Sequence, residues 1–396
     1  MRETETVFKI KTMNSISQCG IDYLTGKGCM VGPELEAPDA MLIRSADLHE
    51  YAFNEELLAI GRAGAGFNNI PIEDCAEKGI VVFNSPGANA EAVKEQEIMS
   101  LIMASRDVLG GIEFVKSIAD RGGEIPKLVE KGKSSFAGPE LMGKTLGVIG
   151  LGAIGALVAN IALEFGMKVY GYDPFMSVDA AWRLSREVKH SENLDELMAL
   201  SDYISINVPY NENTHHMLNA EAFSKMKKGV RIINESRAEV VDDVAMTEAL
   251  SAGTVGKYVT DFPNETILKA PNVIAMPHLG ACTPESEERC AEMAAAELMD
   301  YLQNGNIRNS VNLPDATLPR MGVCRLCVIH RNVPKMLTKI LDFISSREIN
   351  VEHMINKPHG DYAYTIIDLG KKIGPKTADA MRQMENVLRV RVIYTD

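Results

Sequence analysis

The chain has 396 residues, which is enough for two or three domains that each bury a core. It is 46% hydrophobic and 24% charged, as is ordinary for a globular protein. The net charge of −13 argues against a nucleic-acid partner, and no apolar run approaches the roughly 18 residues of a membrane span. Seven scattered cysteines and the lack of an apolar signal core at the N-terminus lead us to expect a cytoplasmic protein with reduced thiols.

The first 140 residues alternate between short apolar runs and helical patterns, which indicates an α/β domain with a parallel sheet. A short helix is expected at 70–78, ending at Gly79, and a long one at 90–108. Glycine and lysine-rich stretches near 122 and 132 are interpreted as looser connections. Strands are expected at 7–10, 40–43, 57–60 and 80–83.

A glycine-rich fingerprint follows the apolar run at 145–149 and opens a helical segment. The next strand, 168–173, ends on Asp173, which lies 18 positions beyond the last glycine. A dinucleotide site needs this arrangement, because the glycines and the helix N-terminus accept the pyrophosphate while the acid binds the ribose hydroxyls. The acid would repel a ribose phosphate, so NAD is expected rather than NADP. The fingerprint residues are Gly150, Gly152, Ala153, Ile154 and Gly155.

The alternation resumes after the fingerprint and leads to a second long helix at 284–302. We interpret the two long helices as crossings between domains, so that the chain returns to the first domain. The predicted fold is therefore two doubly wound parallel-sheet domains, a flavodoxin-like substrate domain and an inserted Rossmann domain. The substrate domain comprises 1–92 and 282–316, and the NAD domain 93–281. Strands in the second half are expected at 203–208, 230–234, 256–260 and 273–276.

A proline-flanked linker at 314–319 precedes a third module, 320–396, whose pattern is strand, helix, strand, strand, helix, strand. This βαββαβ order is ferredoxin-like. Cys324 and Cys327 lie three apart on its first strand, so they point to opposite faces and we expect no metal site.

Three residues follow successive strands of the second half and suit dehydrogenase chemistry. His278 can exchange a proton with a substrate oxygen, and Glu265 could pair with it and raise its pKa. Arg237 can clamp a carboxylate bidentately. Each alone could be a turn or surface residue, but the carboxyl ends of parallel strands meet at one edge.

Together with the fingerprint, the segments 42–45, 62–70, 84–90 and 277–281 closely resemble the D-isomer-specific 2-hydroxyacid dehydrogenases. The resemblance covers nearly the whole chain and implies that Arg237, Glu265 and His278 are catalytic. It implies that the loop with Arg62 cradles the substrate carboxylate through backbone amides. The loop residues that we expect to bind substrate are Ala65, Gly66 and Asn68.

The same resemblance implies NAD contacts beyond the fingerprint. Ala238 stands where the family has glycine, and an acid usual before the Phe-Pro pair is shifted by one position, to Asp261. Neither departure removes a catalytic group. The additional cofactor contacts that we expect are Val208, Glu235, Asp261, His278 and Gly280.

A phosphorylated substrate needs further cations, and Arg44, Arg62 and Lys94 are the ones available. The resemblance and these cations imply oxidation of 3-phosphoglycerate to 3-phosphohydroxypyruvate, the first step of L-serine synthesis. Two alternatives stay open: reduction of hydroxypyruvate, glyoxylate or another small 2-oxo acid, and nucleotide sensing without catalysis, as in the related corepressors.

The last module is similar to an ACT domain, which in this family often binds serine. His330, Asn332 and Asn350 would then be effector contacts. Lys335 stands where the family loop has glycine and is expected to crowd that pocket. Both a subunit contact and feedback by L-serine remain open for the module, and the family leads us to expect a homodimer or homotetramer.

Overall fold

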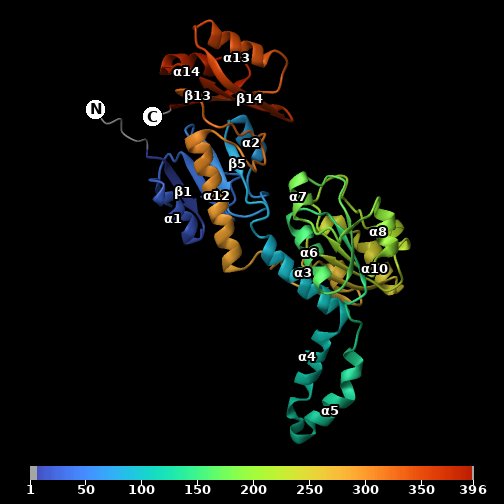
Figure 1. Cartoon of the computed structure of the whole chain (residues 1–396). Coiled ribbons are helices and arrows are strands. Elements are labelled where there is room, and N and C mark those ends of the chain that lie inside the picture. Colours follow the sequence, from blue (N-terminus) through green and yellow to red (C-terminus); the bar gives the residue numbers. More distant parts are fainter. Residues whose placement is uncertain (1–6, 395–396) are drawn as a thin grey trace. The chain divides into compact units, whose positions relative to one another are not determined.

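The computed structural model describes residues 7–394. The described chain forms two compact units: the second is Ala90–Thr283, and the first comprises the described residues up to Asn89 together with those from Pro284 onward (Figure 1). The first unit is thus discontinuous in sequence. Among the described residues, no helix combines the length and the apolar character that crossing a membrane requires.

The first unit contains a five-stranded parallel sheet in the order β2-β1-β3-β4-β5. Alternate residues of its strands pack on opposite faces, as the pleat requires. Leu42 and Phe83 share a cluster with Leu298 of α12, whereas Ile43 and Val82 pack toward Cys75 of α2. The elements are β1 (Lys9–Met13), α1 (Gln18–Gly26), β2 (Met30–Gly32), β3 (Ala40–Ile43), β4 (Ala59–Arg62), α2 (Ile72–Glu77), β5 (Val81–Phe83) and α12 (Pro284–Asn304).

The end of the chain adds a four-stranded antiparallel sheet in the order β14-β15-β13-β16. Cys324 and Cys327 of β13 lie in different apolar clusters, as their spacing predicts. Cys327 faces the core that contains α12, so this sheet face packs on the first sheet's domain. The elements are β13 (Cys324–Arg331), α13 (Met336–Ser345), β14 (Val351–His359), β15 (Tyr362–Leu369), α14 (Pro375–Arg382) and β16 (Val387–Tyr394).

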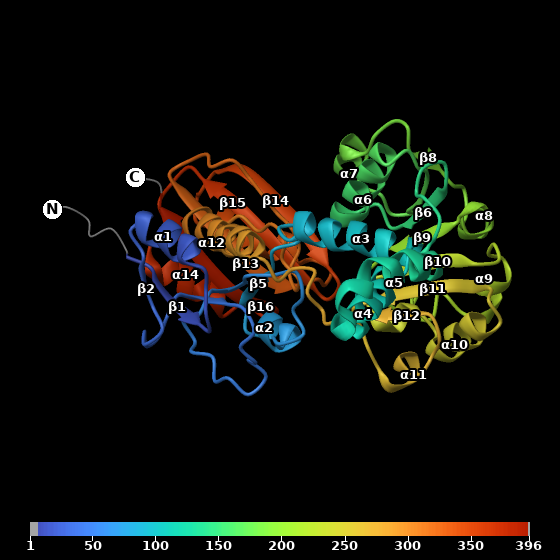
Figure 2. The same cartoon turned by 90° about the horizontal axis from the view of Figure 1, so that it is seen from below.

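The second unit contains a seven-stranded parallel sheet in the order β12-β11-β10-β9-β6-β7-β8 (Figure 2). The order reverses direction at β6, which places the turn after β6 at the switch point where doubly wound sheets bind ligands. The strands are β6 (Thr145–Ile149), β7 (Lys168–Tyr172), β8 (Lys189–His190), β9 (Tyr203–Ile206), β10 (Val230–Asn234), β11 (Val255–Thr260) and β12 (Val273–Ala275).

Helices cover both faces of this sheet. Leu101 of α3 and Val158 of α6 pack with Val148 on one face, whereas Met246 of α10 packs with Ile232 on the other. The helices are α3 (Ala90–Ser105), α6 (Ala153–Glu164), α7 (Val178–Arg183), α8 (Leu194–Leu200), α9 (Ala220–Ser224), α10 (Asp243–Ser251) and α11 (Glu265–Leu268), with the 3-10 turn η3 (Ala238–Val240).

A helical arm between α3 and β6 differs from the loose connections that we predicted. It comprises α4 (Val108–Ser117), η1 (Ala119–Glu124), α5 (Ile125–Gly132) and η2 (Lys133–Phe136), and it extends away from the sheet of its unit (Figure 1). None of its residues is buried, apart from Ile118 in the link between α4 and η1. The glycines on which that prediction rested mark breaks between short helices, since Gly122 has φ +52° inside η1 and Gly132 is the last residue of α5.

Candidate active site

The glycine fingerprint forms a tight turn between β6 and α6. Gly150 has φ +88°, and a Cβ at Gly155 would lie 1.9 Å from the Gly150 carbonyl oxygen, so neither position accepts a side chain. A Cβ at Gly152 would meet nothing within 4 Å. The turn therefore leaves open space at the N-terminus of α6, where Ala153 and Ile154 begin the helix and its amides can bind an anion.

The acid that we predicted for the ribose lies beside this turn. Oδ2 of Asp173 accepts a hydrogen bond of 2.8 Å from the Leu151 amide, and Oδ1 accepts one of 2.9 Å from Phe175. Asp173 follows directly on β7, the neighbour of β6 in the sheet. The two hydrogen bonds hold the carboxylate at the edge of the glycine turn, as a dinucleotide site requires.

The histidine after β12 is paired with an acid, but not with the one that we predicted. His278 Nδ1 lies 2.8 Å from Oδ2 of Asp261, whose side chain is 1% exposed. An ionised carboxylate only accepts hydrogen bonds, so Nδ1 carries a proton and Nε2 remains for a ligand. The hydrogen bond to Asp261 raises the pKa of His278, while partial burial opposes the rise. This pair is a histidine held in one tautomer by a buried acid.

The expected pairing of Glu265 with His278 is not found in this structure. Glu265 is 85% exposed, and its Oε1 accepts a 2.6 Å hydrogen bond from Nζ of Lys269. The cause is local: the Asn264 side chain accepts a hydrogen bond from the Ile267 amide and so caps α11, which makes Glu265 the first helical residue. Its side chain lies on the solvent face of that short helix.

Two further acids are buried at the same edge of the sheet. Glu235 follows β10, and its Oε1 accepts a 2.5 Å hydrogen bond from the Ser100 hydroxyl. Glu97 of α3 accepts a hydrogen bond from the Ser205 hydroxyl. Burial raises the pKa of Glu235 to about 7 and that of Glu97 to about 8. Glu235 was expected from the sequence as a cofactor contact, whereas Glu97 was missed.

Unsatisfied oxygens mark this cluster as a place for a ligand. Oε2 of Glu235 and Oδ1 of Asp261 are buried and have no hydrogen-bond partner within the described part of the chain. Gln96 donates to Oδ2 of Asp261 at 3.4 Å, so the other oxygen of that carboxylate is the one left without a partner. The clue in the sequence was the polar triplet Gln96, Glu97 and Ser100 on a helix whose other inward positions are apolar. Buried acceptors without donors favour a ligand that brings N–H or O–H groups.

Arg237 follows β10 and belongs to the same edge. Its side chain is exposed, and Nη1 donates to the Ser236 carbonyl oxygen at 2.6 Å. Its charge lowers the pKa of His278, which opposes the effect of Asp261. Because Asn234 donates to the Arg237 carbonyl oxygen at 2.9 Å, the loop that carries the guanidinium is held in place.

The other expected NAD contacts lie near these groups. Val208 borders the glycine turn, since its Cγ1 lies 2.9 Å from the position of a Cβ on Gly150. A Cβ at Gly280 would lie 3.3 Å from Cγ2 of Val93 on α3. Both belong to the second unit, together with Asp173, Glu235, Asp261 and His278.

The structure places the expected substrate residues in both units. Arg44 pairs with Glu287 at 2.7 Å within the first unit. Lys94 belongs to the second unit, where it pairs with Glu91. Arg62 is the last residue of β4, and the partly exposed loop after it contains Ala65, Gly66 and Asn68.

The expected effector residues are not arranged as one site. His330 is 2% exposed, and its Nδ1 and Nε2 contact the Arg331 carbonyl oxygen at 2.8 Å and the Thr365 hydroxyl at 2.9 Å. Asn332 donates to the Gly360 carbonyl oxygen, and Asn350 donates to Glu352. A buried histidine with both nitrogens engaged has no nitrogen free for a ligand, which corrects the expectation for His330. The strand alternation of β13 directs its side chain to the same sheet face as Leu326 and Val328, which is covered by α13.

The comparison with known proteins agrees with this site. Residues 99–280 match the family model "D-isomer specific 2-hydroxyacid dehydrogenase, NAD binding domain". D-3-phosphoglycerate dehydrogenase from Escherichia coli (strain K12) is 31% identical over 353 residues, which cover 86% of this chain and 82% of that protein. D-3-phosphoglycerate dehydrogenase from Methanocaldococcus jannaschii is also 31% identical, over 86% of this chain and 63% of that protein.

Solved structures show the same fold. The NAD+-bound 3-phosphoglycerate dehydrogenase from Entamoeba histolytica aligns with a TM-score of 0.59 at 25% identity, over 78% of this chain and 99% of that one. A glyoxylate reductase from Paecilomyes thermophila aligns with a TM-score of 0.62 at 24% identity, over 78% of this chain and 99% of that one. With its glycine turn, its ribose acid and a histidine held by a buried carboxylate, this chain belongs to the D-isomer-specific 2-hydroxyacid dehydrogenase family.

Proposed function

We propose that the protein is a cytoplasmic NAD-dependent D-3-phosphoglycerate dehydrogenase, which oxidises 3-phosphoglycerate to 3-phosphohydroxypyruvate. The observation that carries the proposal is the His278–Asp261 pair at the carboxyl edge of a Rossmann-type sheet, beside the glycine turn. It is supported by relatives of that name, which match most of this chain.

The residues present fit NAD. The open space at Gly152 and the first amides of α6 suit the pyrophosphate, and Asp173 suits the ribose hydroxyls. The orphaned oxygens of Glu235 and Asp261 suit the amide group of the nicotinamide, which has N–H donors. When bound, NAD supplies the hydride acceptor.

The protein's own groups handle the proton and the carboxylate. Nε2 of His278 takes the proton of the substrate hydroxyl, and Asp261 stabilises the imidazolium that results. Arg237 binds the substrate carboxylate. We therefore assign to Asp261 the positioning role that the family resemblance suggested for Glu265, because only Asp261 reaches the histidine ring here.

Phosphate binding is assigned to cations that are already partly engaged. Arg44 and Lys94 form ion pairs with Glu287 and Glu91, so an incoming phosphate has to compete with two carboxylates. Arg62 leads into the loop whose backbone amides we assign to the substrate carboxylate.

Steady-state oxidation of NADH with 3-phosphohydroxypyruvate, hydroxypyruvate and glyoxylate tests the proposal. We expect kcat/KM to be highest for the phosphorylated acid, and preference for an unphosphorylated one would instead indicate a general 2-oxo-acid reductase. His278→Ala should abolish turnover and leave NADH binding intact. Absence of turnover with all three acids would refute the enzyme assignment and favour a nucleotide-sensing role.

For the C-terminal residues 320–396 we propose an ACT-type module that contributes to subunit contact. The β13-α13-β14-β15-α14-β16 order supports the assignment as an ACT-type module. Lys335 has φ +70°, where a glycine would be unstrained, and its side chain is the one that we expect to crowd an effector pocket. The exposed apolar side chains of α4, at Leu109, Ile112 and Val115, offer further surface for a homodimer or homotetramer. Cooperative inhibition by millimolar L-serine would contradict this role and restore the feedback alternative.

A further inference from the structure

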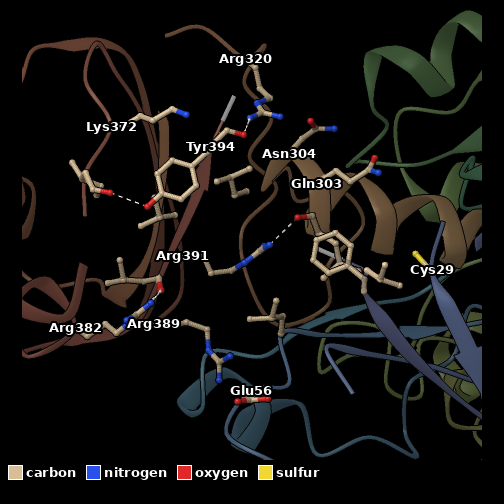
Figure 3. Close-up of a pocket in the computed structure, with 18 of the residues that line it drawn as sticks. Cys29, Glu56, Gln303, Asn304, Arg320, Lys372, Arg382, Arg389, Arg391 and Tyr394 are labelled. Atoms are coloured by element: carbon tan, nitrogen blue, oxygen red, sulfur yellow. Dashed lines mark hydrogen bonds between the residues drawn. The ribbon is translucent and has the colours of Figure 1, made fainter. Parts of the chain in front are cut away.

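A cavity of about 1510 Å³ lies within the first unit, where the C-terminal module faces the first sheet's domain (Figure 3). One wall comes from α14, β16 and the residues before them. The opposite wall comes from the end of α12 and from loops near Cys29 and Glu56. This volume exceeds the 300–1,000 Å³ of typical small-molecule pockets, so a metabolite with its water shell fits.

The charge of the lining is opposite to that of the whole protein. Six cationic side chains line the cavity against only two acids, Glu55 and Glu56, although the chain carries a net charge of −13. The cationic residues are Lys27, Arg320, Lys372, Arg382, Arg389 and Arg391. Clefts lined by one sign of charge concentrate ions of the other sign.

The two arginines of β16 are held by neutral groups. Arg391 donates to the carbonyl oxygens of Tyr301 and Leu302, both at 2.9 Å, and one of these bonds is visible in Figure 3. Arg389 donates to the carbonyl oxygens of Leu57 at 2.9 Å and Lys78 at 2.8 Å. Within the described residues, neither arginine has a carboxylate within ion-pair distance.

These carbonyl contacts fix the guanidinium groups without neutralising them. The end of α12 offsets part of the Arg391 charge, because a helix C-terminus carries about half a negative charge. Among the described residues, no helix as long as α12 ends beside Arg389. Burial lowers the pKa of Arg389. Both arginines are partly buried, and positive charge withdrawn from water without a counter-charge is costly, so an anion in the cavity would be stabilised.

Two of the cations that line the cavity, Lys372 and Arg382, are exposed to solvent and so accessible to a ligand. The Lys372 ammonium lies 5.7 Å from the Tyr394 ring, and no ion pair is found for it among the described residues. Arg382 pairs with Asp379 at 2.5 Å, and its Nε and Nη2 donate to the Val390 carbonyl oxygen of β16. Both side chains are exposed, and a thermal melt of the variant checks that the contact of Arg382 with β16 is not needed for the fold.

We propose that this cavity binds a small organic polyanion that carries phosphate groups or several carboxylates. Lys372 and Arg382 contact the ligand directly, while Arg389 and Arg391 supply the field that favours it. Because the walls belong to the C-terminal module and to the first sheet's domain, the bound anion stabilises their contact. The site is separate from the residues assigned to the dehydrogenase reaction.

Calorimetric titration of the full-length protein with tripolyphosphate and, separately, with citrate tests the proposal at constant ionic strength. We expect at least one probe to bind the unmodified protein. In the double variant Lys372→Ala/Arg382→Ala, this binding should be lost or weakened at least tenfold. Binding of tripolyphosphate alone indicates a phosphorylated ligand, and binding of citrate alone a polycarboxylate.

The matched control is Lys371→Ala, which removes the same charge from an exposed neighbour outside the cavity lining. It should bind the probes as the unmodified protein does. Failure of both probes to bind overturns the proposal. Equal binding by the double variant, or equal weakening by Lys371→Ala, also overturns it, because either result would indicate an unspecific charge effect.

Discussion

Replacing Asp261 tests which acid serves the histidine. Asp261→Asn keeps the shape of the side chain but removes the charge that lies 2.8 Å from His278 Nδ1. A hydrogen bond to a charged group is worth about 1.5–3 kcal/mol, and 1.4 kcal/mol corresponds to a tenfold change in rate. We therefore expect kcat/KM for 3-phosphohydroxypyruvate to fall between about tenfold and a hundredfold.

The pH dependence separates positioning from a general structural effect. Asp261 raises the pKa of His278, so Asp261→Asn should lower it. Reduction needs the protonated ring, and its rate should therefore fall off at lower pH than in the unmodified enzyme. Oxidation needs the neutral ring, and the rise of its rate with pH should likewise shift to lower pH.

Glu265→Gln is the matched control, because this acid is 85% exposed and pairs only with Lys269 among the described residues. It should change kcat/KM less than twofold, with an unaltered pH profile. NADH binding by fluorescence should be measured for both variants, since a loss of binding in Asp261→Asn would indicate a cofactor contact instead. The assignment of Asp261 as the partner of His278 is wrong if Glu265→Gln lowers kcat/KM tenfold or more while Asp261→Asn does not.

Three further predictions concern stability and cofactor binding. Burial raises the pKa of Glu97 to about 8, so the folded state binds this proton more tightly than the unfolded state and the free energy of unfolding should fall as the pH rises from about 4.5 through 8. Measured by thermal melts at several pH values, this fall should be smaller by at least about 1 kcal/mol in Glu97→Gln. Gly155→Ala should unfold at lower temperature because its Cβ would meet a carbonyl oxygen at 1.9 Å, whereas Gly152→Ala should leave the melting temperature of the cofactor-free protein unchanged and weaken NADH binding at least tenfold. Arg325→Ala should lower the free energy of unfolding in urea by about 3–5 kcal/mol, because it leaves Asp368 buried without its partner at 2.7 Å, and a loss below 1 kcal/mol would contradict this.

Much of the architecture was predictable from local patterns. Apolar runs located β3 and β10 at their observed bounds, and the run of residues 145–149 located β6. The glycine turn and Asp173 were also recognisable, because a tight turn and a ribose acid need particular residue types at a fixed spacing. The three-residue strand β2 (Met30–Gly32) was not predicted, since so short a run carries no periodicity.

The pairing within the site depended on tertiary structure. Asp261 and Glu265 stand four residues apart, and both follow the same strand, so either could have been the partner of His278. Thr260 pairs with Ala275 across β11 and β12, which brings the ends of these strands together. The capping of α11 by Asn264 then directs Glu265 toward solvent.

The sequence by itself determined the fold class, the dinucleotide turn and the set of residues from which the active site is drawn, because those depend on local periodicity and spacing. Only the tertiary structure decided that Asp261 holds His278, that Glu97 and Glu235 are buried with raised pKa, and that His330 is enclosed in its sheet. The physical reason is that burial and side-chain pairing depend on strand register and helix starts, which join residues far apart in the chain. The distribution of charge shows the same limit, because six cationic side chains of a chain with net charge −13 come together around one cavity only when the chain folds.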